Sequence, residues 1–130
     1  MPDITVDLTG KTCLITGGNS GIGKATALGL AGMGATVVIV SRDKERGEVA
    51  LADIIAKSGN RNVELILGDM SSQDSVRRLA SDFKARHEML HLLVNNAGVY
   101  LTRRIITVDG LESTLAINHL GPFLLTNLLA

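Results

Sequence analysis

The sequence predicts an α/β fold of the doubly wound type, in which a parallel sheet carries helices on both faces. Three observations predict it. Short apolar runs of strand length alternate along the chain with longer segments of helical periodicity. The run at 36–40 (TVVIV) is β-branched and apolar on both faces, which is typical of a parallel strand covered on both sides. A glycine-rich segment joins the first apolar run to the first helical pattern.

Four strands and four helices are expected in alternation. The strands are expected at 12–16, 36–40, 63–67 and 90–94. The helices are expected at 21–33, 43–57, 72–86 and 109–130. Gly34 follows the first helix, as glycine often does past a helix C-terminus. Pro122 should kink the last helix, because proline has no N–H and its ring clashes with the preceding turn.

Composition narrows the class of protein. The chain has 130 residues, enough for one domain over 1–130, and its 45% hydrophobic and 20% charged residues are typical of a globular protein. Its 13 basic and 13 acidic residues balance, so no nucleic-acid partner is expected. No apolar run reaches the roughly 18 residues that span a bilayer, and Met1–Gly10 lacks the pattern of a signal peptide. A single cysteine, Cys13, cannot form an internal disulfide, so a cytoplasmic location is expected.

The glycine-rich segment Thr16–Gly23 (TGGNSGIG) predicts a phosphate-binding loop. Glycines let the backbone approach a pyrophosphate closely, and the N–H groups at the start of the following helix point at it. The segment therefore predicts a site for NAD or NADP, whereas a simple turn with no ligand is the alternative. The residues expected to contact the cofactor here are Gly17, Asn19, Ser20, Gly21, Ile22 and Gly23.

Four motifs in order along the chain resemble those of the short-chain dehydrogenase/reductase family. Thr16–Gly23 matches the family's TGxxxGxG, and Asn95–Gly98 matches its NNAG. Asp69 follows the third strand, where the family places a carboxylate that contacts the adenine amino group. Asn118, in INHLGPF, matches the asparagine of the family's catalytic helix. The details resemble most closely the retinol dehydrogenase-like branch.

The resemblance implies a Rossmann fold, of which this chain holds about four of the usual seven strands. It implies an oxidoreductase that transfers a hydride between a nicotinamide and a carbonyl or alcohol carbon of a small apolar substrate, such as a retinoid. It also implies that the cofactor site takes residues from two further segments. These are Asp69, Met70, Asn95, Asn96, Ala97 and Gly98.

The end of the second strand discriminates between the two cofactors. NAD-binding members place an acid there, which hydrogen-bonds the ribose 2′-hydroxyl. Ser41 stands at this position and Arg42 follows, and a guanidinium suits the 2′-phosphate of NADP. NADP is therefore expected over NAD. Two alternatives remain: Arg42 pairs with Asp43 or Glu45 on the surface, or Asp43 itself is the ribose-binding acid.

Most of the family's catalytic residues have no counterpart in this sequence. Tyr100 precedes Asn118 instead of following it, Arg104 replaces the lysine expected four residues later, and Ser113 comes too early. We therefore expect the chain to end before the serine strand and the Tyr-x-x-x-Lys helix, and to bind cofactor without turnover. Asn118 remains as a catalytic residue or as an amide that braces its helix. The alternative function is a non-catalytic dinucleotide-binding sensor or regulatory module.

Two further expectations concern metals and assembly. His87 and His91 are four residues apart, but a helix end and a strand start fall between them, so no metal site is expected. The last helix ends in the apolar residues Phe123, Leu124, Leu125, Leu128 and Leu129, and the fourth strand lies at an edge of the sheet. A homo-oligomer is therefore possible.

Overall fold

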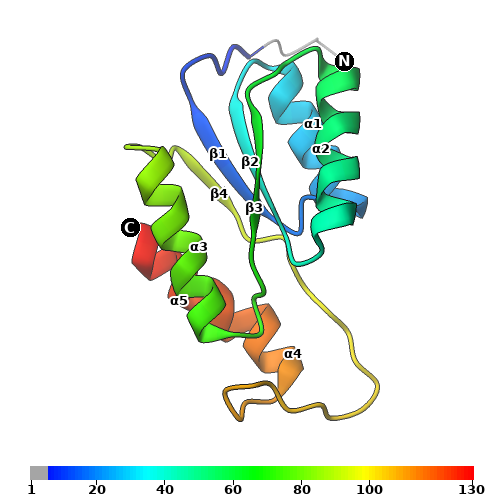
Figure 1. The fold of residues 1–130 in the computed structure, drawn as a ribbon, viewed down its shortest axis with the longest axis vertical. Coiled ribbons are helices and arrows are strands. Elements are labelled where there is room, and N and C mark those ends of the chain that lie inside the picture. The colour runs from blue at the N-terminus through cyan, green and yellow to red at the C-terminus, as the bar shows by residue number, and fades with distance from the viewer. Residues whose placement is uncertain (1–5) are drawn as a thin grey trace.

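The computed structural model describes residues 6–130 and contains the alternating order that the sequence predicts (Figure 1). Part of the segment considered as a leader, residues 1–5, lies outside the described residues. The elements are β1 (Thr12–Thr16), α1 (Gly21–Gly32), β2 (Thr36–Ser41), α2 (Lys44–Ser58), β3 (Val63–Leu67), α3 (Gln73–Arg86), β4 (Leu92–Val94), α4 (Ser113–Leu115), the π-helix η1 (Ala116–Leu120) and α5 (Gly121–Leu129).

The four strands form one parallel sheet in the order β3-β2-β1-β4. Strand β1 pairs with β2 on one side and with β4 on the other. The chain therefore moves outward from β1 to β3 and then returns to the other side of β1. The predicted doubly wound Rossmann fold is confirmed, with the strand order reversing beside β1.

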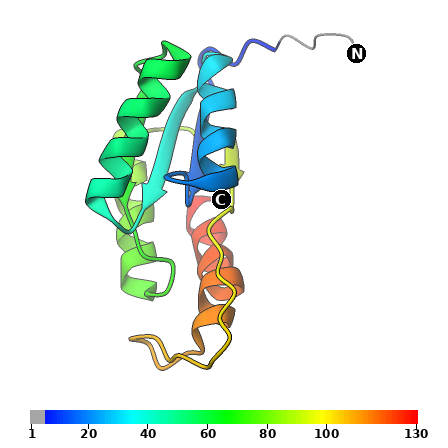
Figure 2. The same ribbon diagram turned by 90° about the vertical axis from the view of Figure 1, so that its right-hand side faces the viewer.

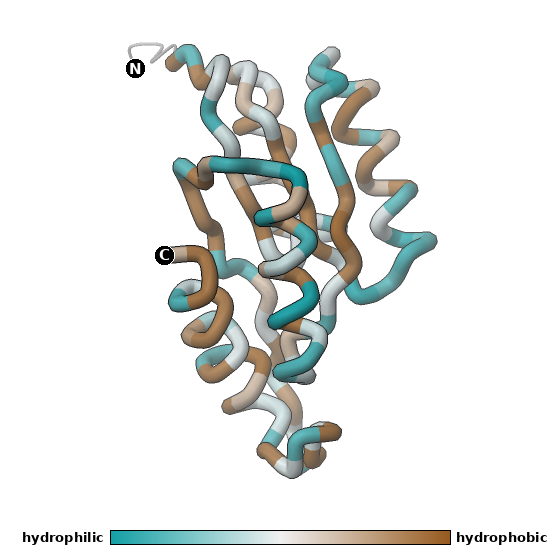
Figure 3. Tube along the Cα trace, turned by 60° about the vertical axis from the view of Figure 1, so that its left-hand side comes forward, coloured by the Kyte–Doolittle hydropathy of each residue, from teal (hydrophilic) through white to brown (hydrophobic). Residues whose placement is uncertain are grey.

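Helices cover both faces of the sheet, α1 and α2 on one and α3 and α5 on the other (Figures 1 and 2). Because side chains alternate along a strand, β1 contributes to two cores. Cys13 and Ile15 pack with α1 and α2, whereas Leu14 packs with α3 and α5. The strands are largely hydrophobic along their length (Figure 3), as burial on both faces requires. Burial also raises the pKa of the Cys13 thiol.

The expected boundaries of the last helix and the last strand were wrong. The helical segment begins at Ser113 and not at residue 109, because Gly110 adopts a φ of +74° and turns the chain. Ile106 and Glu112 form an antiparallel bridge across this turn. The Glu112 carboxylate then caps α4 by accepting bonds from the N–H groups of Thr114 and Leu115. Strand β4 begins at Leu92 and not at residue 90.

Pro122 interrupts the regular helix, as predicted. Proline has no N–H to donate to a carbonyl four residues earlier. The turn before it widens into η1, where the N–H of Gly121 bonds the carbonyl of Ala116, five residues back. Pro122 itself lies in the first turn of α5, where a missing N–H costs least.

The histidines, the edge strand and the end of the last helix have defined positions in the fold. Within residues 6–130, no helix is long and apolar enough to cross a membrane, and no three metal-ligating side chains come together. His87 lies with Nε2 2.9 Å from Glu64 Oε2, and His91 Nδ1 accepts a bond from the N–H of Thr12. Strand β4 is an edge of the sheet and Phe123 is 63% exposed. The expected oligomer stays a prediction.

Candidate functional site

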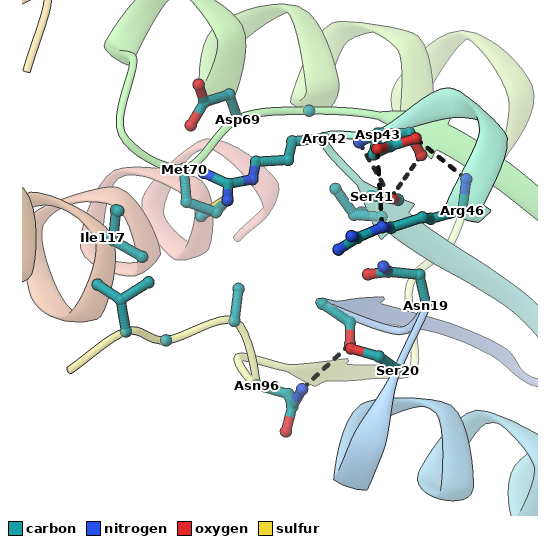
Figure 4. A pocket seen from close by; sticks show the side chains of 16 residues that line it. Asn19, Ser20, Ser41, Arg42, Asp43, Arg46, Asp69, Met70, Asn96 and Ile117 are labelled. Carbon is teal, nitrogen blue, oxygen red and sulfur yellow. Dashed lines mark hydrogen bonds and ion pairs between the residues drawn. The ribbon is translucent and has the colours of Figure 1, made fainter. Parts of the chain in front are cut away.

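A cavity of about 510 Å³ opens at the carboxyl ends of the strands, where the strand order reverses (Figure 4). Ligands of doubly wound folds bind at this place. The cavity receives residues from the loops that follow β1, β2, β3 and β4. Ten of the predicted cofactor residues line it, namely Gly17, Asn19, Ser20, Ser41, Arg42, Asp69, Met70, Asn96, Ala97 and Gly98.

The glycine loop is shaped by backbone requirements. Gly17 and Gly21 have φ values of +67° and +54°, a region that other residues rarely adopt. A Cβ added to Gly23 would lie 2.2 Å from the carbonyl oxygen of Gly17, so glycine is needed for the helix to approach the loop. Gly21, Ile22 and Gly23 therefore lie beside the cavity and shape it, and are not among the residues that line it.

The start of α1 differs from the starts of α2 and α3. Asp43 and Ser72 cap α2 and α3 with their side chains, and each of these helices carries an acid in its first turn. The N-cap residue of α1, Ser20, makes no side-chain cap bond, and the first turn holds no acid. The N-terminal end of α1 lies next to Ser20, which lines the cavity, and has neither a side-chain cap nor an acid in its first turn. This end of α1 suits a phosphate.

Thr16 joins the glycine loop to the NNAG segment. Its buried Oγ1 accepts hydrogen bonds from the N–H groups of Asn96 and Ala97, at 3.1 and 3.0 Å. The side-chain amide of Asn96 returns a bond to the carbonyl of Gly17 (Figure 4). Asn95 points elsewhere, because its amide donates to Thr126 Oγ1 on α5 and the residue does not line the cavity.

The loop after β2 places two arginines at the cavity. Arg42 and Arg46 both extend into it, from opposite sides of Asp43 (Figure 4). The Asp43 carboxylate accepts a bond from the N–H of Arg46 and lies 3.9 Å from its Nε, so it serves as the cap of α2. Buried Ser41 is engaged in the same turn, where its hydroxyl donates to the carbonyl of Asp43.

Asp69 and Met70 form the wall after β3. One carboxylate oxygen of Asp69, Oδ1, accepts bonds from the N–H and hydroxyl of Ser71. These bonds fix the carboxylate and leave Oδ2 to accept a bond from a ligand amino group. Met70 is buried, and its apolar side chain offers a surface for a flat ring.

Asn118 holds the opposite end of the cavity together. Its Oδ1 accepts a bond from the N–H of Val99 at 2.8 Å, and its Nδ2 donates to the carbonyl of the same residue at 2.7 Å. The side chain therefore braces the chain just after Gly98. Pro122 offers no N–H to the Asn118 carbonyl, which an α-helix would normally supply from four residues on.

Several residues of the site were not predicted from the sequence. Arg46 was missed because the prediction covered only the end of the second strand, whereas Arg46 lies in the first turn of α2. Thr16 was treated only as part of the loop, because its bonds join segments about eighty residues apart along the chain. The other missed lining residues are Val40, Gly68, Val99 and Ile117.

The arrangement can bind an elongated anionic ligand. It has an uncapped helix N-terminus at α1, two guanidinium groups after β2, and apolar walls at Met70 and Ile117. The family's proton-transferring residues are not supplied here by the nearest candidates. Tyr100 is 91% exposed and Ser113 is buried with its hydroxyl bonded to the carbonyl of Ile105, and neither lines the cavity.

Comparison with known proteins identifies relatives of this chain. The family model for short chain dehydrogenases matches residues 11–130. Human "Dehydrogenase/reductase SDR family member 12" is 46% identical over 124 residues, which are 95% of this chain and 39% of that protein. Bovine "Retinol dehydrogenase 12" is 49% identical over the same shares of the two chains. The chain thus spans about two fifths of the length of the curated relatives that it matches.

A solved structure extends the likeness to three dimensions. The NADP active-site complex of Pseudomonas aeruginosa RhlG superposes with a TM-score of 0.82 at 34% identity. The match covers 95% of this chain and 48% of RhlG. The fold of this chain is therefore similar to that of about half of RhlG.

Proposed function

Since the chain belongs to the short-chain dehydrogenase family, we propose that it forms the NADP-binding part of an oxidoreductase that acts on small carbonyl or alcohol compounds. When bound, NADP supplies or accepts the hydride. Residues of this chain would bind and orient it: the start of α1 would hold the pyrophosphate, and Asp69 and Met70 would hold the adenine. The nicotinamide end would lie toward the segment from Gly98 to Asn118.

One observation carries the choice of NADP over NAD. Two arginines, Arg42 and Arg46, reach the cavity at the end of β2, where a 2′-phosphate would lie. Asp43, the acid that would otherwise select NAD, is used as the cap of α2 and pairs with Arg46. A guanidinium stabilises a phosphate dianion by charge-assisted hydrogen bonds, whereas a ribose hydroxyl gains little from it. The NADP named with the RhlG structure supports the same choice.

The substrate proposal rests on the relatives. Retinol dehydrogenase 12 is named for an apolar alcohol, so we assign this chain to an enzyme for retinoid-like or similar apolar alcohols and carbonyls. The serine, tyrosine and lysine of the reaction are assigned to sequence that the relatives have beyond the matched region. Asn118 would contribute by bracing Val99, a residue that lines the cavity, through its two side-chain hydrogen bonds.

A second function is a dinucleotide-binding module without turnover. The position of Tyr100 favours it for the 130-residue chain, because the tyrosine is 91% exposed and outside the cavity. Such a module would respond to the NADP pool through binding alone. In a mixture of the chain with NADPH and retinal, steady oxidation of NADPH, followed by its absorbance, would exclude the module. The same assay on a chain extended through the serine, tyrosine and lysine of the family separates the two functions in the other direction, because only the enzyme should then oxidise NADPH.

Calorimetric titration with NADPH and NADH tests the cofactor proposal. The unchanged chain should bind NADPH more tightly than NADH, and Arg42→Asp should reverse the order because it places an anion beside the 2′-phosphate. Arg61→Asp is the matched control, since Arg61 makes the same charge change on an exposed loop outside the cavity. If the ratio of NADPH to NADH affinity in Arg42→Asp is the same as in the unchanged chain, the choice of NADP is overturned. If the unchanged chain binds neither cofactor, the proposed function itself is overturned.

A further inference from the structure

We propose that Asp109 is a positioning residue that joins the two ends of the cofactor site. It does not line the cofactor cavity, and it lies in the loop between β4 and α4. The inference rests on the proposed function, because it concerns how the chain holds NADP. The structure carries it through three contacts made by the segment from 109 to 121.

The first contact reaches the adenine end. Asp109 Oδ2 accepts a hydrogen bond of 2.8 Å from the N–H of Gln73, the first residue of α3. The turn directly before Gln73 contains Asp69 and Met70, which line the cavity. The hydroxyl of Ser72 accepts a bond from the N–H of Ser75 in the same first turn, so Asp109 provides a second cap from 36 residues away.

The second contact lies on the same turn. A Cβ added to Gly121 would be 2.5 Å from the carbonyl oxygen of Met70, so α5 begins in close backbone contact with the wall of the cavity. The third contact reaches the nicotinamide end, where Asn118 forms two hydrogen bonds with the backbone of Val99. One short segment therefore touches both ends of the site.

The loop that carries Asp109 is itself well held. The N–H of Asp109 bonds Thr107 Oγ1, the N–H of Gly110 bonds the Thr107 carbonyl, and Ile106 bridges to Glu112. A mainly apolar cavity of about 250 Å³ lies between this loop, the start of α3 and α5. Because this cavity leaves part of the interface without packing contacts, the attachment of the loop to α3 depends more on the hydrogen bond from Gln73 to Asp109 than it would in a filled interface.

The test compares Asp109→Ala with Asp74→Ala. Asp74 lies in the first turn of α3, so its loss removes the same charge from the same helix end without touching the loop. Two quantities are measured on each full chain: the Kd for NADPH, and the amide hydrogen exchange of Gln73 and Val99. Asp109→Asn serves as the rescue, because an amide oxygen still accepts the Gln73 bond.

We expect Asp109→Ala to weaken NADPH binding about threefold to tenfold, the range of a lost helix cap, and to speed exchange at both amides. Asp109→Asn should restore most of both properties, and Asp74→Ala should change NADPH binding less than twofold. A shift of equal size in Asp74→Ala would assign the effect to charge at the helix end and overturn the proposal. Unchanged exchange at Val99 in Asp109→Ala would overturn it as well. If the unchanged chain binds no NADPH, the proposed function fails, whereas the exchange measurements still decide the role of Asp109.

Discussion

Thr16 Oγ1 lies 3.1 Å from the backbone nitrogen of Asn96 and accepts its hydrogen bond, which joins the end of β1 to the end of β4. The same oxygen accepts a bond from the N–H of Ala97. Thr16 is fully buried, and the two bonds are partly buried. The two motifs that identify the cofactor site, TGGNSGIG and NNAG, are therefore held together by one hydroxyl.

Replacing Thr16 with valine should cost stability and cofactor affinity together. Valine has nearly the same shape but no acceptor, so two partly buried N–H groups would lose their partner, at about 1–3 kcal/mol in the free energy of unfolding. Urea unfolding followed by circular dichroism measures this loss. Thr16→Ser keeps the hydroxyl and should lose much less. A valine variant as stable as the parent chain would show that the hydroxyl does not hold the two segments.

The second prediction concerns Gly23 and Gly29 in α1, because a Cβ would be crowded at Gly23 and would meet open space at Gly29. A Cβ at Gly23 would meet the Gly17 carbonyl at 2.2 Å and Asn96 Nδ2 at 2.4 Å. Gly23→Ala should therefore destabilise the chain by about 1–3 kcal/mol, as overpacking does, and should reduce NADPH binding. The backbone of the loop cannot move away without breaking the Thr16 and Asn96 bonds.

Gly29→Ala in the same helix is the matched control. Nothing lies within 4 Å of a Cβ placed there, and its φ is not positive. Alanine should stabilise this position by up to about 1 kcal/mol through helix propensity. Thermal unfolding of the two variants should move in opposite directions, and a common direction would contradict the local packing argument.

The sequence predicts the strands and the first three helices well, because strand runs such as 36–40 are apolar on both faces and the glycine loop marks the first turn. The start of the last helix was placed four residues early, since Asp109 and Gly110 resemble a helix start but form a turn. The side-chain hydrogen bonds of Thr16, Asp43 and Asn118 could not be predicted from the sequence. Such bonds depend on tertiary placement, which periodicity does not encode.

Acid should weaken the link between α1 and α2. Hydrogen bonds from Lys24, and then from Lys57, lower the pKa of Asp53 below its ordinary value of 3.8. A carboxylate with a lowered folded pKa stabilises the protein above its unfolded pKa, and this contribution is lost as the pH falls through the folded value. Asp53→Asn should therefore reduce stability at neutral pH and flatten the fall in stability between about pH 4 and pH 2.

Thermal unfolding across this pH range measures the effect. Asp82→Asn is the control and should leave the slope nearly unchanged, because Asp82 is an exposed acid on α3 that forms no ion pair within residues 6–130. Parallel curves for Asp53→Asn and the parent chain would show that the lysine pairs contribute nothing to folding. Lys24→Met should reproduce part of the Asp53→Asn curve, because it removes the lysine that lowers the pKa of Asp53 most.

Arg46 should distinguish the two cofactors even though the sequence did not point to it. It lines the cavity together with Arg42, and its weak pairing with Asp43, at 3.9 Å, leaves the guanidinium available to a stronger anion. Arg46→Gln keeps a helix-compatible side chain and removes the charge. We expect the Kd for NADPH to rise about tenfold, or ~1.4 kcal/mol, and the Kd for NADH to stay within about twofold. The loss should shrink as salt is added, because the contact is exposed and screened. Equal weakening for both cofactors would assign Arg46 to the shared part of the ligand, and the 2′-phosphate would then depend on Arg42 alone.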